Sequence, residues 1–128
     1  MYLFSHYTNF YLALTPDPVQ NLNTTVDTHK PSVTLVWDPP ANAGHAGDVT
    51  KYQIRFWDKA KEYYNEMAVD GSSTAIVITG ESGLRPLTTS TFEVRACCGD
   101  DASQEWRTVS TFIGTWTLQE FLFSMNTC

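Results

Sequence analysis

The sequence predicts an all-β protein, a sandwich of two antiparallel sheets with seven strands. Three observations predict this class. Val, Ile, Thr, Tyr, Phe and Trp, the residues that favour strands, make up more than a third of the 128 residues. Apolar and polar residues alternate over several short segments, as in strands with one face in a core. Gly, Pro, Asp and Asn separate these segments at short intervals, which is typical of a sandwich.

The first half of the chain contains three predicted strands. Pro16 and Pro18 precede a strand at 19–26, because proline is tolerated where a strand starts but cannot donate a ladder hydrogen bond. Apolar residues alternate in 32–37 and again in 51–57, and a glycine-containing loop separates these two segments. The residues that the alternation places on the inner faces are Val33, Leu35, Trp37, Tyr52, Ile54 and Phe56.

The second half contains four predicted strands. Segments 63–69 and 74–79 flank Asp70–Gly71, a dipeptide that readily adopts positive φ, so a tight hairpin is expected there. Alternation from residue 92 to residue 96 indicates a sixth strand, and the last strand spans about 106–113. The inner residues predicted here are Ile76, Ile78, Phe92, Val94 and Ala96.

Five markers occur along the chain in a recognisable order. They are Pro18 with Leu22, Trp37 followed by Pro39–Pro40, Tyr52-Gln53-Ile54, Leu84-x-Pro86-x-Thr88, and Phe92-x-Val94-x-Ala96. With this order and spacing the chain resembles a fibronectin type III module, an immunoglobulin-like sandwich. Another immunoglobulin-like sandwich is the alternative. The resemblance implies that Trp37 fills the space between the sheets and that Leu84 and Pro86 cap one end.

The chain departs from the family pattern at one corner of the sandwich. Members of the family usually carry a tyrosine six residues after the leucine of Leu-x-Pro, and its hydroxyl bonds to backbone. This position is Ser90 here, and the preceding connection, Gly80–Gly83, is longer than usual.

The resemblance divides the chain into an extension at 1–15, a domain at 16–114 and a tail at 115–128. Segment 1–14 is apolar but lacks the basic residue of a signal peptide, so a packed or linker segment is the favoured interpretation. The tail is apolar too, and its residues 117–125 are compatible with a helix. We expect it to pack on the sandwich or to meet a partner.

Composition excludes several function classes. The formal charge of −6, with no cluster of Lys or Arg, argues against nucleic-acid binding. No run of 18 apolar residues is present, so no transmembrane segment is predicted.

The cysteines, Cys97, Cys98 and Cys128, cannot all pair internally. Strand alternation places Cys98 inward and Cys97 outward, so Cys97 is expected to be the more reactive thiol and the partner in any bridge to Cys128.

The residue types needed for catalysis or metal binding do not come together in the sequence. No nucleophile elbow is present, and three histidines (His6, His29 and His45) lie far apart. Asp100 and Asp101 are interpreted as part of a solvated loop more readily than as a cation site. We therefore predict a protein that is not an enzyme and holds no cofactor or metal.

Binding features are more informative. Loops 38–48, 69–73 and 98–105 are expected to cluster at one end of the sandwich, where rigid scaffolds often present recognition residues. On the outer face of the predicted strands at 51–57, 91–96 and 106–113, arginines are expected to stack on an indole. The candidate protein-binding residues are Arg55, Trp57, Arg95, Trp106, Asp100 and Asp101.

The predicted function is a non-enzymatic protein-binding or adhesion module of an extracellular or cell-surface protein. Asn23-Thr24-Thr25 matches the acceptor pattern for N-glycosylation, which favours that location. The alternative is a passive structural spacer, including one in an intracellular protein of the muscle or cytoskeletal type. The unpaired cysteine count fits the intracellular alternative.

Overall fold

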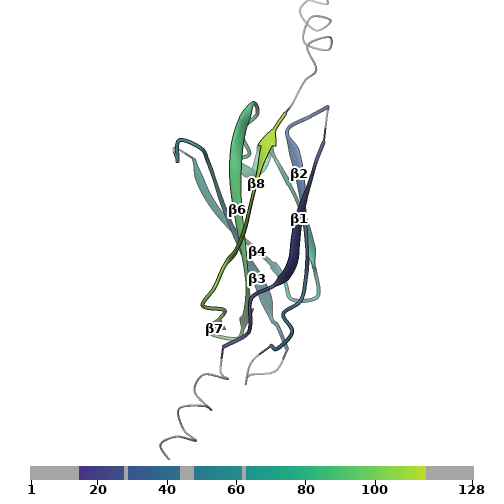
Figure 1. Ribbon diagram of the computed structural model, residues 1–128, viewed down its shortest axis with the longest axis vertical. Helices are drawn as coiled ribbons and strands as arrows, with labels where there is room; N and C mark the ends of the chain where they lie inside the picture. Colours follow the sequence, from purple (N-terminus) through teal and green to yellow (C-terminus); the bar gives the residue numbers. More distant parts are fainter. Residues whose placement is uncertain (1–14, 28, 44–47, 62, 115–128) are drawn as a thin grey trace, which may run out of the picture.

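Two antiparallel sheets face each other in the computed structural model, which describes residues 15–27, 29–43, 48–61 and 63–114 (Figure 1). One sheet has the order β1-β2-β5, and its strands are β1 (Gln20–Val26), β2 (Ser32–Asp38) and β5 (Ala75–Thr79). The other sheet has the order β4-β3-β6, with β7 and β8 both paired to β6. Its strands are β3 (Lys51–Asp58), β4 (Tyr64–Asp70), β6 (Thr88–Cys98), β7 (Asp101–Ala102) and β8 (Arg107–Ile113). The predicted two-sheet sandwich is confirmed.

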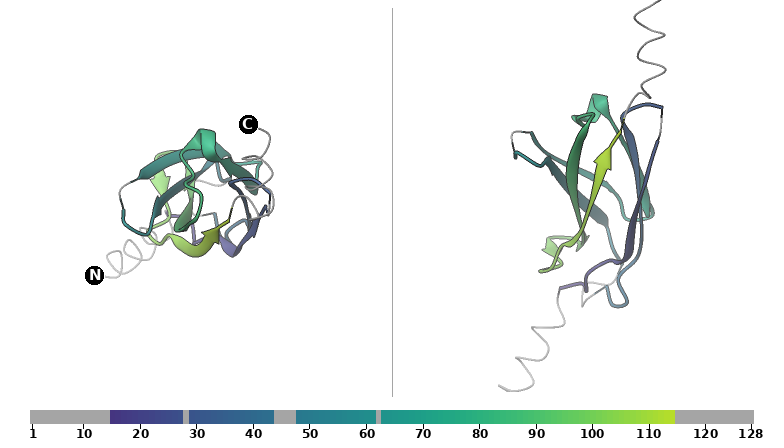
Figure 2. Two further views of the ribbon diagram at one scale, coloured as in Figure 1. Left: turned by 90° about the horizontal axis from the view of Figure 1, so that it is seen from above. Right: turned by 45° about the horizontal axis from the view of Figure 1, so that its top comes forward.

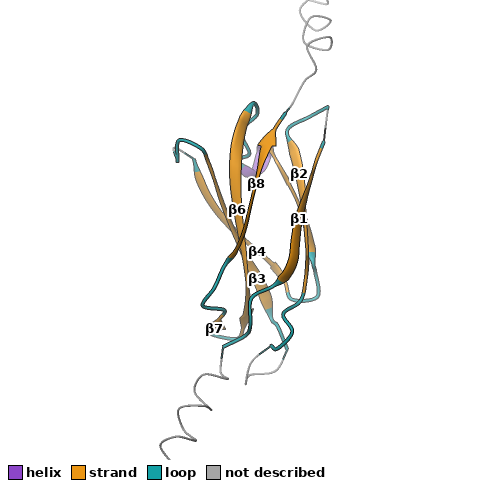
Figure 3. Cartoon of the chain, viewed as in Figure 1, coloured by secondary structure: helices purple, strands orange, loops and turns teal. Residues whose placement is uncertain are grey.

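The described part of the chain contains eight strands where seven were predicted. The additional one, β7, has two residues and pairs with the end of β6, within the segment predicted as a loop. A short 3-10 helix, η1 (Gly80–Ser82), occupies the long connection before Leu84 (Figure 3). Ser90 is buried at the corner where the family usually has tyrosine.

The predicted hairpin at Asp70–Gly71 is wrong. β4 pairs with β3 in the larger sheet and β5 pairs with β2 in the smaller one, so the chain crosses between the sheets at this turn. Gly71 is not among the residues with positive φ. It is needed for space instead, because a Cβ atom built on Gly71 would lie 2.1 Å from the carbonyl oxygen of Val49.

The space between the sheets is filled by the side chains predicted to lie there. All eleven belong to the core or pack against it, and only Ile76 is half-buried. Trp37 of β2 is 1% exposed and meets Tyr52 of β3 edge to face, with ring centroids 5.2 Å apart. The sequence prediction omitted two residues of this core cluster, Val19 and Ile113. Leu84 caps the core as expected, whereas Pro86 is exposed.

The expected exposure of Cys97 is wrong. Cys97 is 2% exposed and Cys98 is 1% exposed. Cys97 lies near the end of β6, where Lys51 of β3 and Ala102 of β7 flank it. Burial is the main cause that raises the pKa of both thiols.

We expect neither thiol of this vicinal pair to react rapidly in the folded protein. The thiolate is the reactive form, and burial both disfavours it and blocks access. Alkylation with iodoacetamide, followed by mass spectrometry of the peptide that contains Cys97 and Cys98, should show slow labelling in buffer and rapid labelling in urea. Rapid labelling of Cys97 in buffer would contradict the buried position. The proposed bridge to Cys128 involves a residue outside the described part of the chain.

Candidate functional site

Side chains of β3 and β6 that point away from the core lie next to one another on the larger sheet. The strands are antiparallel, and their register pairs Arg55 with Glu93 and Gln53 with Arg95. Inner and outer residues alternate along both strands, so these four polar side chains share the outer face. The outer face is therefore a row of charged and amide groups held by regular ladder pairing.

Trp106 covers part of this row. It immediately precedes β8, and its ring lies 3.9 Å from Cζ of Arg55 and 4.4 Å from Cζ of Arg95. Arg55 Nε donates to Glu93 Oε1 at 2.6 Å, and Arg95 Nε donates to Gln53 Oε1 at 2.6 Å. We call Arg55, Arg95 and Trp106 the arginine–tryptophan stack. The expected cation–π contacts are present, and the hydrogen bonds fix both guanidinium groups.

Trp57 does not join this stack. Its ring lies parallel to that of Tyr64 on β4, with centroids 6.1 Å apart and planes at 15°. The hydroxyl of Tyr64 donates to Glu66 Oε1 at 2.9 Å. Desolvation and the Glu66 carboxylate raise the pKa of Tyr64, while nearby Arg55 acts in the opposite direction. The outer face thus carries two aromatic groups, with Arg55 close to both.

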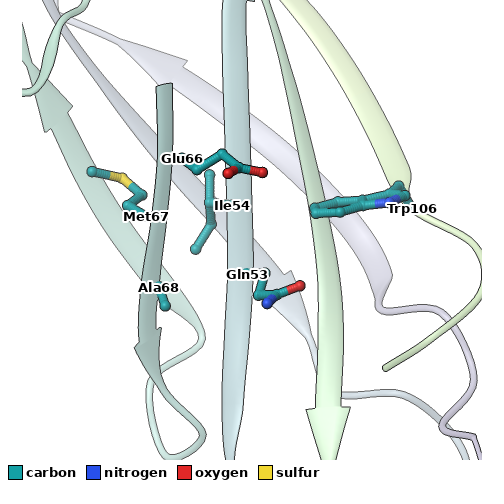
Figure 4. A pocket seen from close by; sticks show the side chains of 6 residues that line it. All are labelled: Gln53, Ile54, Glu66, Met67, Ala68 and Trp106. Carbon is teal, nitrogen blue, oxygen red and sulfur yellow. The ribbon is translucent and has the colours of Figure 1, made fainter. Parts of the chain in front are cut away.

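Two surface pockets lie on this side of the larger sheet. One has a volume of about 220 Å³ and is lined by Arg55, Trp57, Lys61 and Tyr64. The second has a volume of about 280 Å³, and its six lining residues are Gln53, Ile54, Glu66, Met67, Ala68 and Trp106. Figure 4 shows that the amide of Gln53 and the carboxylate of Glu66 point toward the side on which Trp106 lies, whereas Met67 points away.

The three loops predicted to cluster at one end are joined there by hydrogen bonds. Thr50 connects two of them, since its carbonyl accepts from Gly71 N at 3.0 Å and its hydroxyl accepts from Gly99 N at 3.0 Å. Cys98 Sγ donates to the carbonyl of Ala43 at 2.7 Å. This hydrogen bond joins the 38–48 loop to the 98–105 loop. The predicted clustering is confirmed.

The remaining candidates lie apart from the arginine–tryptophan stack. Asp100 is exposed in the turn after β6, and Asp101 begins β7, so both belong to the loop end. Asn23 is exposed on β1 in the smaller sheet, and its side-chain oxygen accepts from Thr24 N at 2.9 Å.

Sequence reasoning missed three participants in this surface: Lys61, Tyr64 and Glu66. The exposure of one tyrosine on the outer face could have been predicted, because adjacent tyrosines at the start of a strand place one ring on each face. Which ring would meet Trp57 depends on the register between β3 and β4, which alternation alone does not give.

Among the described residues, no three His, Cys, Asp or Glu side chains gather closely enough to hold a metal ion. His29 is exposed, whereas His6 and His45 lie outside the described residues. None of the described residues form a helix of the length and apolarity needed to cross a bilayer.

Comparison with known proteins identifies the family. The family model for the fibronectin type III domain matches residues 17–113. A search of curated proteins returned no match. Among solved structures, the fibronectin type III domain of the human collagen alpha-1(XX) chain is similar, with a TM-score of 0.65 and 17% identity. The similarity covers 80% of this chain and 90% of that one.

Two titin structures are similar as well. Domains A168–A170 of titin give a TM-score of 0.64 at 22% identity over 78% of this chain and 32% of that one. Titin kinase with its flanking domains gives 0.63 at 22% identity over 89% of this chain, which spans only 19% of that structure. These identities show a shared fold alone, whereas the family model covers most of the chain. The chain belongs to the fibronectin type III family.

Proposed function

We propose that this domain is a non-enzymatic protein-binding module and that the outer face of β3, β6 and β8 binds the partner. The observation that carries the proposal is the arginine–tryptophan stack, with a pocket on the same sheet face beside it. Trp and Arg are enriched in interface hot spots because they bury large areas while still offering a π face or donors. Side chains already held by contacts lose less entropy on binding.

Asn23 supports placement of the module in an extracellular or cell-surface protein. It is exposed on β1, in the other sheet, so a glycan there leaves the proposed surface uncovered. We propose that Asn23 is glycosylated and that residues 16–114 form the binding domain. Asp100 and Asp101, at the loop end, form a second part of the proposed contact.

The double variant Trp57→Ala/Arg95→Ala tests the binding proposal. We expect capture of the partner from a cell-surface extract by the immobilised protein to fall at least tenfold, because hot-spot truncations each cost about 2 kcal/mol or more. The melting temperature should stay unchanged. Val36→Ala/Val77→Ala is the matched control, since both residues are exposed on the opposite sheet. Retained capture with a lower melting temperature would assign the surface to stability instead.

A passive spacer is the second candidate function. Figure 1 shows the described chain entering the sandwich at the end where β7 lies and leaving it from the end of β8 at the opposite end, and the right-hand view of Figure 2 agrees. This arrangement suits a module that holds its neighbours apart. The similarity to titin and to collagen domains concerns fold and favours neither compartment. A passive spacer would capture no partner from the extract, with or without the two substitutions.

A further inference from the structure

One pocket on the outer face combines two cationic and two aromatic side chains. It is lined by Arg55, Trp57, Lys61 and Tyr64, has a volume of about 220 Å³, and is called the basic pocket below. Arg55 and Lys61 are its charged lining residues, and Arg55 already pairs with Glu93 through Nε at 2.6 Å. Lys61 and the remaining N–H groups of Arg55 can donate to an anionic group that enters the pocket.

Three of the four lining side chains are held in place by other side chains. Trp57 and Tyr64 stack on each other, and the Tyr64 hydroxyl donates to Glu66 outside the pocket. Arg55 is fixed by Glu93 and lies over Trp106, while 31% of its side chain remains exposed. Little side-chain freedom is left to lose when a ligand enters, so the pocket is preorganised.

Lys61 is positioned by an unusual backbone conformation. Its N–H donates to the carbonyl of Asp58 at 2.9 Å, in the turn that follows β3. Its φ is +59°, in the left-handed region that residues with a side chain seldom adopt. Asp58 also accepts from Tyr63 N at 3.3 Å, which tightens the same turn. Strained backbone of this kind gathers at binding sites.

We propose that the basic pocket receives the carboxylate of a glutamate or aspartate side chain from an acidic segment of the partner protein. The inference rests on the proposed binding function and names the chemistry that the site recognises. Arg55 and Lys61 supply charged donors, which form the strongest hydrogen bonds to carboxylates. The methylene stem of the acidic side chain packs against the rings of Trp57 and Tyr64.

A sulfated polysaccharide fits the basic pocket less well. Such a polymer carries anions at regular intervals and is bound by clusters of Lys and Arg. The basic pocket instead offers two cations beside two rings, which matches one anion on an apolar stem.

Nuclear magnetic resonance of the labelled protein tests the proposal with defined probes. One probe is an acetylated hexapeptide of alternating Glu and Ala, and its control replaces Glu by Gln. We expect the acidic peptide to shift the indole N–H signal of Trp57 and the amide signal of Lys61, with saturation, and the Gln peptide to leave both unchanged. A heparin-derived oligosaccharide is the third probe, and we expect it to bind more weakly than the acidic peptide.

Two lysine variants separate a specific contact from general attraction. Lys61→Gln should weaken the acidic peptide threefold to fivefold, the usual effect of removing one partner from a surface ion pair. Lys59→Gln removes the same charge two residues away, at an exposed position that does not line the pocket, and should change affinity by less than twofold. Equal weakening by both variants, or stronger binding of the oligosaccharide, would overturn the proposal.

The two proposals fail in different ways. If Trp57→Ala/Arg95→Ala abolishes partner capture while Lys61→Gln leaves both capture and peptide binding unchanged, the binding surface stands and the acidic ligand is wrong. If the double variant captures the partner normally, the proposed binding function itself fails.

Discussion

Trp37→Ala is expected to lower the free energy of unfolding by about 3 to 5 kcal/mol, the usual cost of deleting a large buried aromatic side chain. Trp37 is 1% exposed and belongs to β2 of the smaller sheet, yet its ring packs edge to face on Tyr52 of the larger sheet. Removing the indole leaves a cavity between the sheets, because ladder hydrogen bonds within each sheet prevent them from collapsing together.

Urea denaturation followed by circular dichroism measures this effect. A domain of this size is stable by roughly 5 to 15 kcal/mol, so the variant should fold with a much lower midpoint. Val36→Ala is the matched control, since Val36 precedes Trp37 on the same strand, points outward and is 43% exposed. It should cost no more than about 0.5 kcal/mol. A cost below about 1 kcal/mol for Trp37→Ala would show that the indole is not the contact between the sheets.

The elements that the sequence predicted well are those in which one physical rule dominates. Alternation placed ten of the eleven expected side chains fully inside the sandwich, because a strand with one buried face has a strict period of two. The exception, Ile76, is half-buried and lies on β5, an edge strand paired with β2. The stacking of Arg55 and Arg95 on Trp106 followed from the same alternation.

The errors occurred where a long-range contact overrides a local pattern. Asp70–Gly71 has the local chemistry of a hairpin turn, but β4 and β5 find different partners, so the turn joins two sheets. Alternation places Cys97 on the outer face of β6, but it is buried, at the end of β6 that pairs with β7. The contact between Trp57 and Tyr64 was not predicted, because it depends on the register of β4.

Gly71→Ala is expected to cost about 3 kcal/mol, the upper end of the usual range for an overpacked site. An added Cβ would lie 2.1 Å from the Val49 carbonyl oxygen and 2.7 Å from its carbon. Both atoms are backbone, so no side chain can rotate away and the turn itself must shift. The Gly71 N–H also donates to the carbonyl of Thr50, and Thr50 holds Gly99 through its hydroxyl. The strain should therefore reach two loops at the same end.

Gly80→Ala is the control for the general effect of replacing glycine on the unfolded chain. Its added Cβ would meet only the Pro31 ring at 3.9 Å, an ordinary contact, so we expect a change within about 0.5 kcal/mol. Urea denaturation compares the two variants, and amide resonances of Thr50 and Gly99 report the loop end. If Gly71→Ala is as stable as Gly80→Ala and those resonances do not move, the crossing turn does not pack against Val49, and the loops are not held together through Thr50.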